Sequence, residues 1–176
     1  MRYLFITLIT TLALFSANLS FEKGSVLAHT SVFGDSTINP SSSNIVSHLT
    51  MKKGDISTLK GSVEVSLTDL KSDNSERDEH MYEAIDTNKY TSTTYTIKSV
   101  AQNNAGSYNV EGSLTLHGIT KNLPILATIT TKGDHVTFKG KTSFKMSDFG
   151  ITPPKLLFLT VRDLLEMKIN TTYKVQ

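Results

Sequence analysis

The feature that most constrains the fold is an alternation of apolar and polar residues through most of the chain after residue 20. Apolar side chains alternate with Thr, Ser, Lys and Asn in one run after another. A period of two is typical of strands that bury one face and expose the other. The pattern predicts eight strands, over residues 25–33, 44–51, 57–67, 93–100, 107–117, 123–131, 135–146 and 164–173.

Short polar turns such as Lys53-Gly54-Asp55 and Lys132-Gly133-Asp134 separate most of these runs. Connections of this length join neighbouring strands as antiparallel hairpins. Eight antiparallel strands remove their exposed edges by closing into a barrel, and a barrel of this size can enclose one small ligand. The sequence therefore predicts an all-β fold, an eight-stranded antiparallel β-barrel.

Residues 73–85 break the period of two. Arg77, Met81, Ala84 and Ile85 are spaced as one stripe of a helix, and Asp73, Asn74 or Ser75 is suited to cap its first turn. We expect one short helix here.

Residues 151–159 form a second irregular segment. Pro153 and Pro154 exclude a central strand, and the run Leu156-Leu157-Phe158-Leu159 follows them. An apolar loop is unfavourable in water, so we expect it to pack over one end of the barrel or against another subunit.

The N-terminus carries one basic residue, Arg2, and continues as a short apolar run, which is typical of a secretory signal peptide. We expect residues 1–20 to be the signal peptide and residues 21–176 to form one domain that is periplasmic or secreted after cleavage. An uncleaved membrane anchor is the alternative. The chain has no cysteine, so its sheet and core must hold it together without disulfides.

Composition argues against several partners and cofactors. The formal charge is +2, Lys and Arg are scattered, and there is no Trp, which gives no footprint for nucleic acid. The five histidines, His29, His48, His80, His117 and His135, show no metal-ligand spacing. No phosphate-binding glycine loop or nucleophile motif is present. We expect no cofactor.

The densest charged cluster is Arg77-Asp78-Glu79-His80. Such a group can supply acid, base and orienting roles in an enzyme. Acidic residues also favour the first turn of a helix, and Arg77 can pair with a carboxylate or a carbonyl there. The structural interpretation is preferred.

Three segments carry a family resemblance: Arg77-Asp78-Glu79-His80-Met81, then residues 114–121 with the sequence LTLHGITK, then Ser147-Asp148-Phe149-Gly150-Ile151. In this order and spacing they resemble the signature of the YceI-like family. The resemblance implies a lipocalin-like barrel whose hollow interior holds an isoprenoid or another long-chain lipid.

This resemblance favours a hollow barrel over a solid core. The predicted function is a carrier that binds a polyisoprenoid or other long-chain lipid without covalent chemistry, with at most transient membrane contact. The alternatives are a solid-core protein that dimerises or docks a partner through residues 153–159, and a lipid-modifying enzyme that uses residues 77–80. The predicted ligand-binding residues are Met81, Ile85, Tyr95, Ile97, Tyr108, Val110, Leu114, Phe138, Phe144 and Phe158.

Overall fold

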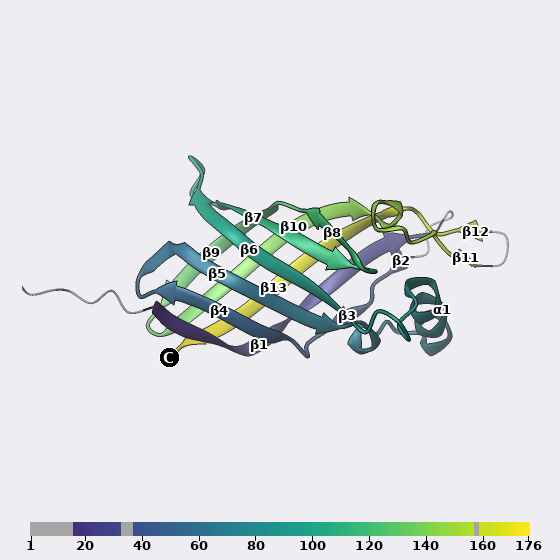
Figure 1. The fold of residues 1–176 in the computed structure, drawn as a ribbon, viewed down its shortest axis with the longest axis horizontal. Helices are drawn as coiled ribbons and strands as arrows, with labels where there is room; N and C mark the ends of the chain where they lie inside the picture. The colour runs from purple at the N-terminus through teal and green to yellow at the C-terminus, as the bar shows by residue number, and fades with distance from the viewer. Residues whose placement is uncertain (1–15, 33–36, 157–158) are drawn as a thin grey trace, which may run out of the picture.

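The structure, a computed structural model, describes residues 16–32, 37–156 and 159–176. In this part the chain forms a closed barrel of eight antiparallel strands (Figure 1). The strands follow the order β1-β4-β5-β6-β7-β9-β10-β13, and β13 pairs back with β1. The barrel strands are β1 Ser16–Ser31, β4 Val46–Lys52, β5 Asp55–Ser66, β6 Ser92–Gln102, β7 Tyr108–Leu116, β9 Ile125–Lys132, β10 His135–Lys145 and β13 Leu164–Val175.

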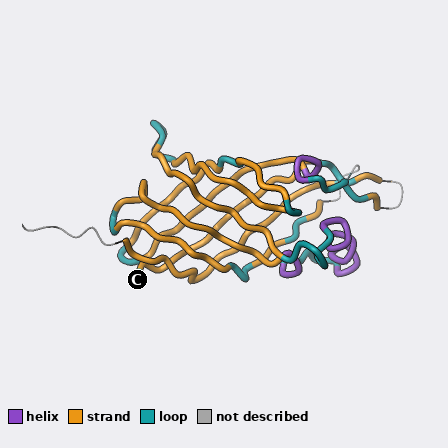
Figure 2. The backbone as a smooth tube through the Cα atoms, viewed as in Figure 1, coloured by secondary structure: helices purple, strands orange, loops and turns teal. Residues whose placement is uncertain are grey.

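In the described residues, three helices and five short strands lie outside the eight barrel strands. The helices lie together at the end opposite the C-terminus (Figure 2). They are α1 Ser75–Ile85 and two single-turn 3₁₀ helices, η1 Leu67–Asp69 and η2 Met146–Phe149. The short strands are β2 Thr37–Ile38, β3 Ser41–Ser42, β8 Ile119–Asn122, β11 Lys155–Leu156 and β12 Leu159–Thr160.

The predicted eight-stranded antiparallel barrel is confirmed, and the structure adds the short strands β2, β3, β11 and β12, which the sequence pattern did not predict. Strand β1 begins at Ser16, nine residues before the predicted start at residue 25. Its first residues pair with β4, as in Leu19 with Leu49. The sequence pattern also missed β8, because this four-residue strand only prolongs the hairpin that follows β7.

The alternation of side chains sets the inner and outer faces as predicted. On β10, Val136, Phe138 and Phe144 are buried, whereas Lys139 and Lys141 are exposed. The buried side chains form two clusters. One cluster contains Val110, Val136 and Tyr173, and the other contains residues of the helical end, such as Leu67 and Phe149.

Helix α1 begins and ends where its capping chemistry requires. The Asn74 side chain accepts a hydrogen bond from the Arg77 backbone N–H at 2.9 Å, which satisfies a donor of the first turn. Asp86 ends the helix in the left-handed conformation, with φ of 54°. The predicted helix over residues 73–85 is therefore present, two residues shorter at its start.

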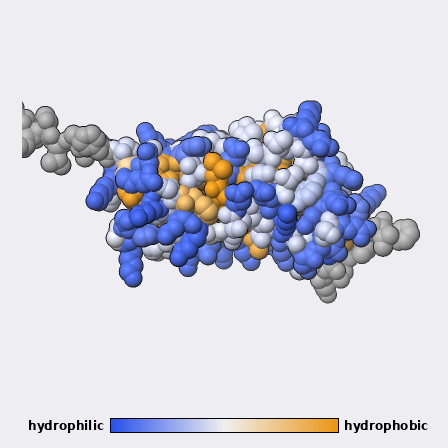
Figure 3. Space-filling model, turned by 90° about the horizontal axis from the view of Figure 1, so that it is seen from below, coloured by the Kyte–Doolittle hydropathy of each residue, from blue (hydrophilic) through white to orange (hydrophobic). Residues whose placement is uncertain are grey.

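Exposed large apolar side chains are scattered over the barrel and include Val46, Ile119, Leu126 and Leu164. The face seen from below is mostly hydrophilic or neutral, with a few separate apolar groups (Figure 3). Within the described residues, no helix is both long enough and apolar enough to cross a membrane.

Two glycines allow neighbouring strands to approach closely. Gly61 has φ of +119°, and a Cβ there would lie 2.0 Å from the His48 carbonyl oxygen on β4. Gly24 has φ of +132°, and its Cβ would lie 2.1 Å from the Asn170 oxygen on β13. Neither position accepts a side chain without movement of the ladder.

We predict that Gly61→Ala lowers the free energy of unfolding by about 3 kcal/mol or more, because it adds a backbone clash to an unfavourable φ. Gly133 is the matched control, since its φ is +64° but nothing lies within 4 Å of its Cβ position. Gly133→Ala should cost only about 1–2 kcal/mol. Urea unfolding followed by circular dichroism measures both, and equal losses would contradict the proposed clash.

Candidate functional site

The interior of the barrel contains a partly open apolar cavity with a volume of about 220 Å³. Side chains from the barrel strands form its wall, and α1 covers it at the helical end. The apolar lining is Leu19, Val26, Ala28, Ile38, Pro40, Leu49, Leu59, Val63, Val65, Leu67, Leu70, Met81, Ala84, Ile85, Ile97, Leu114, Leu116, Leu123, Ile125, Val136, Phe138, Phe144, Met146, Ile151, Pro154, Val161, Leu165, Met167 and Ile169.

Seven of the ten predicted ligand-binding residues line this cavity: Met81, Ile85, Tyr95, Ile97, Leu114, Phe138 and Phe144. Val110 is fully buried but belongs to the packed cluster rather than to the cavity wall. Tyr108 packs at the margin of the same cluster. Phe158 lies outside the described residues. Pro154, from the predicted apolar loop, does line the cavity.

Sequence reasoning missed several wall residues. Leu19 was assigned to the signal peptide, although it is buried and lines the cavity. Thr171 and Tyr173 were passed over, although they continue the inward alternation of Met167 and Ile169 on β13. The alternation of inward and outward residues along β13 would have identified Thr171 and Tyr173 as wall residues.

Most polar groups of the wall are satisfied by the backbone. Thr30, Thr93 and Thr142 donate their hydroxyls to the carbonyls of Leu164, Thr115 and Pro124, at 3.0, 2.9 and 2.8 Å. The Tyr95 hydroxyl donates to the Leu123 carbonyl at 2.8 Å. Burial raises the pKa of the Tyr95 hydroxyl, and the Glu111 carboxylate raises it further, so the phenol stays protonated as a donor.

Thr171 and Tyr173 form the exception. Thr171 is 1% exposed, and its Oγ1 has no hydrogen-bond partner among the described residues. Tyr173 is the next inward residue on β13, and burial raises the pKa of its hydroxyl. The nearby Thr171 hydroxyl opposes that rise in the Tyr173 pKa. Two residues with hydroxyl groups, Thr171 and Tyr173, thus stand among the apolar residues that line the cavity.

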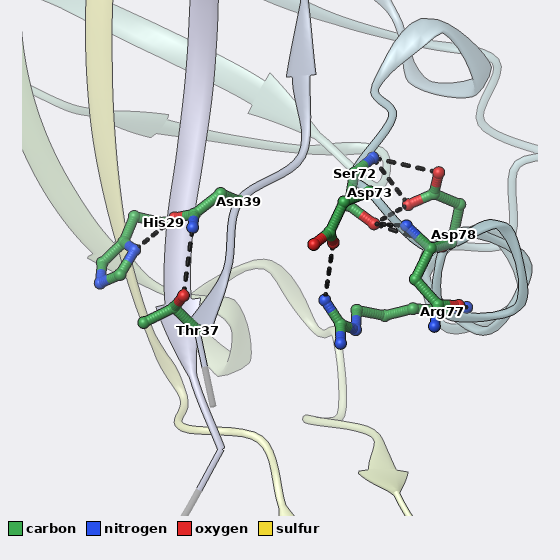
Figure 4. Close-up of polar contacts among 8 residues, drawn as sticks. His29, Thr37, Asn39, Ser72, Asp73, Arg77 and Asp78 are labelled. Carbon is green, nitrogen blue, oxygen red and sulfur yellow. Dashed lines mark hydrogen bonds and ion pairs between the residues drawn. The ribbon is translucent and has the colours of Figure 1, made fainter. Parts of the chain in front are cut away.

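Among the residues that the structure describes, the charged side chains that line the cavity all come from α1: Arg77, Asp78 and His80. Asp78 is buried and accepts hydrogen bonds from the Ser72 N–H at 2.9 and 3.0 Å and from the Ser72 Oγ at 2.6 Å. Arg77 pairs with Asp73 at 3.2 Å (Figure 4). These contacts tie the first turn of α1 to the segment before it, which favours a structural role for the cluster.

The second attachment of α1 is its Tyr82 hydroxyl, which donates to the carbonyls of Leu70 and Thr68 at 2.8 and 3.0 Å. Both carbonyls belong to the same preceding segment that holds Asp78. The polar contacts of the helix are thus local in sequence, while Met81, Ala84 and Ile85 face the cavity.

The histidines lie apart from one another. His29 bonds to Asn39 at 2.6 Å beside β1 (Figure 4), His117 bonds to the Phe149 carbonyl at 3.0 Å, and His135 contacts Glu22 and Asp134 at 3.2 and 2.7 Å. Within the described part of the chain, no group of three or more potential ligands is placed to hold a metal ion.

The arrangement suits an apolar ligand. A cavity of about 150 Å³ lined by apolar side chains stays dry and accepts benzene. The cavity of this barrel is larger, and among the described residues its charged side chains all come from the helical end, so it favours an apolar molecule over water.

The comparisons with known families and sequences agree with this architecture. The YceI-like domain family matches residues 18–173. A UPF0312 protein of Shewanella oneidensis is 35% identical over 101 residues, which is 53% of each chain. A UPF0312 protein of Vibrio parahaemolyticus is 35% identical over 104 residues, or 54% of this chain and 55% of the relative. The chain thus spans about half the length of the curated relatives it matches.

Solved structures share the fold at low sequence identity. Burkholderia cenocepacia BcnA superposes with a TM-score of 0.75 at 16% identity, over 85% of this chain and 95% of that chain. A polyisoprenoid binding domain from Saccharophagus degradans, implicated in plant cell wall breakdown, has a TM-score of 0.70 at 11% identity. It covers 91% of this chain and 98% of its own.

We predict that Phe138→Asp lowers the free energy of unfolding by about 3 kcal/mol or more, because it places an unpaired carboxylate on the cavity wall. Thr137→Asp is the matched control, since its hydroxyl lies near that of Thr172 and points away from the cavity. Its cost should stay below about 1 kcal/mol. Urea unfolding measures both values, and a larger loss for Thr137→Asp would mean that the register of β10 is wrong by one residue.

Proposed function

The chain belongs to the YceI-like family, and on that premise we propose that it is an exported carrier that holds one long-chain lipid, such as a polyisoprenoid, without covalent chemistry. The observation that carries the proposal is the apolar wall of the cavity. The Saccharophagus degradans domain with the same fold is described as polyisoprenoid binding, which supports the same ligand class for this chain.

The size of the cavity sets how much lipid it can enclose. If about 150 Å³ holds the six carbons of benzene, 220 Å³ holds roughly nine. Burying nine methylenes is worth roughly 7 kcal/mol before the costs of ordering the ligand. A longer chain therefore extends beyond the cavity.

Two alternatives receive less support. A solid core is disfavoured by the cavity, although docking through residues 153–159 stays a separate prediction, because Leu157 and Phe158 lie outside the described residues. A lipid-modifying enzyme would use Arg77 to His80, yet Arg77 pairs with Asp73 and Asp78 is held by Ser72. These contacts support a structural role for two of the four residues.

Export is proposed from the apolar, signal-like N-terminus. The fold restricts where the leader can be cleaved, because β1 begins at Ser16 and Leu19 is 2% exposed and lines the cavity. Removal of Leu19 would open a gap in the cavity wall. We therefore propose cleavage before Leu19, so that the processed chain keeps the pairing of Leu19 with Leu49.

We predict that protein purified from its own host carries a lipid, visible by native mass spectrometry as an added mass that organic extraction removes unchanged. Met81→Asp should lose this adduct, because a carboxylate would replace apolar wall beside α1. Glu79→Gln, an exposed substitution on the same helix, should keep it. A wild-type protein that carries no adduct and takes up no added lipid would contradict the carrier proposal. Chemical conversion of the lipid that His80→Ala abolishes would favour the enzyme.

We predict that the exported protein begins at or before Leu19. Intact mass and N-terminal sequencing of the protein recovered outside the cytoplasm measure this position. An N-terminus at residue 20 or later would contradict the expected role of Leu19, and full-length chain in the membrane fraction would favour the uncleaved anchor.

A further inference from the structure

The strand register brings lysine and leucine side chains together on the outer face of the barrel. Strands β9, β10, β13 and β1 are successive neighbours in the sheet (Figure 1), so outward residues of one strand lie opposite those of the next. One row across these four strands consists of Leu126, Lys141, Lys168 and Leu27. Residues that are far apart in the sequence thus form one continuous patch.

Lysines dominate this side of the barrel. Strands β9, β10 and β13 hold one acidic residue, Glu166, and six lysines: Lys132, Lys139, Lys141, Lys145, Lys168 and Lys174. Lys174 pairs with Asp134 at 3.8 Å. In the part of the chain that the structure describes, the other five lysines form no ion pair. We call the outer face of these three strands the lysine wall.

Two lysines of the wall lie directly opposite each other. Lys141 on β10 is the cross-strand partner of Lys168 on β13, and like charges in such positions repel each other. The acidic side chains at the borders of the wall are Glu111 on β7 and Asp163, which accepts two hydrogen bonds from Ser147. An anionic partner over the wall would remove the repulsion between the two lysines.

Exposed leucines lie among these lysines. Leu126 is 56% exposed and Leu164 is 46% exposed. In the ladders, Leu126 lies opposite Lys141 and Leu164 lies opposite Lys145. An aliphatic side chain beside an ammonium group suits the surface of a membrane, because the leucine can enter the acyl boundary while the lysine meets an anionic headgroup.

The helical end of the barrel carries the opposite charge. Residues 69–86, which include α1, hold seven acidic residues and two basic ones, Lys71 and Arg77. An anionic surface therefore repels this end and attracts the lysine wall. The charge distribution favours a barrel that lies on its side on such a surface.

We propose that the lysine wall is a docking surface for a membrane that contains anionic lipids. The lysines contact the headgroups, and Leu126 and Leu164 enter the interface between headgroups and acyl chains. This surface lies outside the cavity, so the inference goes beyond the carrier proposal and does not depend on which molecule the cavity holds.

The test measures cosedimentation of the purified protein with vesicles of phosphatidylcholine alone and of an equal mixture of phosphatidylcholine and phosphatidylglycerol. Wild-type protein should bind only the mixed vesicles, and high salt should weaken that binding. Lys141→Gln combined with Lys168→Gln should weaken it about thirtyfold, or roughly fivefold for each lysine. Lys52→Gln combined with Lys60→Gln is the matched control, because these exposed lysines lie on β4 and β5, across the barrel. The control should bind as wild type does.

The leucines supply a second readout. Leu126→Ser should weaken binding to the mixed vesicles roughly fivefold, because it removes an apolar side chain from the interface. Val46→Ser, at a position on β4 that is 52% exposed, should leave binding unchanged. Urea unfolding checks that the variants fold, and the Lys141 and Lys168 double variant should be at least as stable as wild type, because it removes a like-charged pair.

Loss of binding in the lysine-wall variants, with both controls intact, supports the proposal. Equal losses in the controls, or a wild-type protein that binds neither kind of vesicle, overturn it. The lipid adduct of the carrier proposal is measured without vesicles, so it can persist when docking fails. The two proposals therefore fail separately.

Discussion

The ladder between β1 and β13 is the interaction on which the rest of the structure depends. It runs from Leu19 opposite Val175 to His29 opposite Glu166, and it joins the two ends of a sheet that would otherwise have two open edges. Without this ladder the inner face would be one side of an open sheet, exposed to water. With it, the same side chains surround the cavity. The cavity is therefore a property of closure rather than of any one residue.

Much of the fold follows from patterns that are local in sequence. A period of two predicted the eight barrel strands, and the three capping candidates Asp73, Asn74 and Ser75 predicted the start of α1 within two residues. The start of β1 was missed because residues 16–20 were assigned to the predicted leader. Their membership in the barrel depends on Leu49 and Val175, both distant in the chain. A pattern of neighbouring residues cannot predict that Leu19 pairs with residues so far away in the sequence.

The candidate site was harder to predict than the fold. Alternation identifies which residues point inward, and it placed Phe138 and Leu114 correctly on the cavity wall. Whether an inward side chain meets open space or another side chain depends on the opposite wall, and for this reason Val110 proved to be packed core. Thr171 was missed for a different reason. A single threonine that follows apolar inward residues on a strand suggests that the buried face of the strand has ended, and only the structure shows that Thr171 is still buried.

The attachment of α1 bears on how a bound molecule exchanges with its surroundings. Tyr82 and Asp78 hold the helix to residues 68–72, a stretch directly before it in the chain, rather than to distant barrel strands. This stretch is in turn held to the barrel, because Lys71 exchanges two backbone hydrogen bonds with Ser41 and the Asn44 side chain donates to Asp69. An opening at this end therefore has to break a few named contacts, whereas it leaves the ladders between the barrel strands in place.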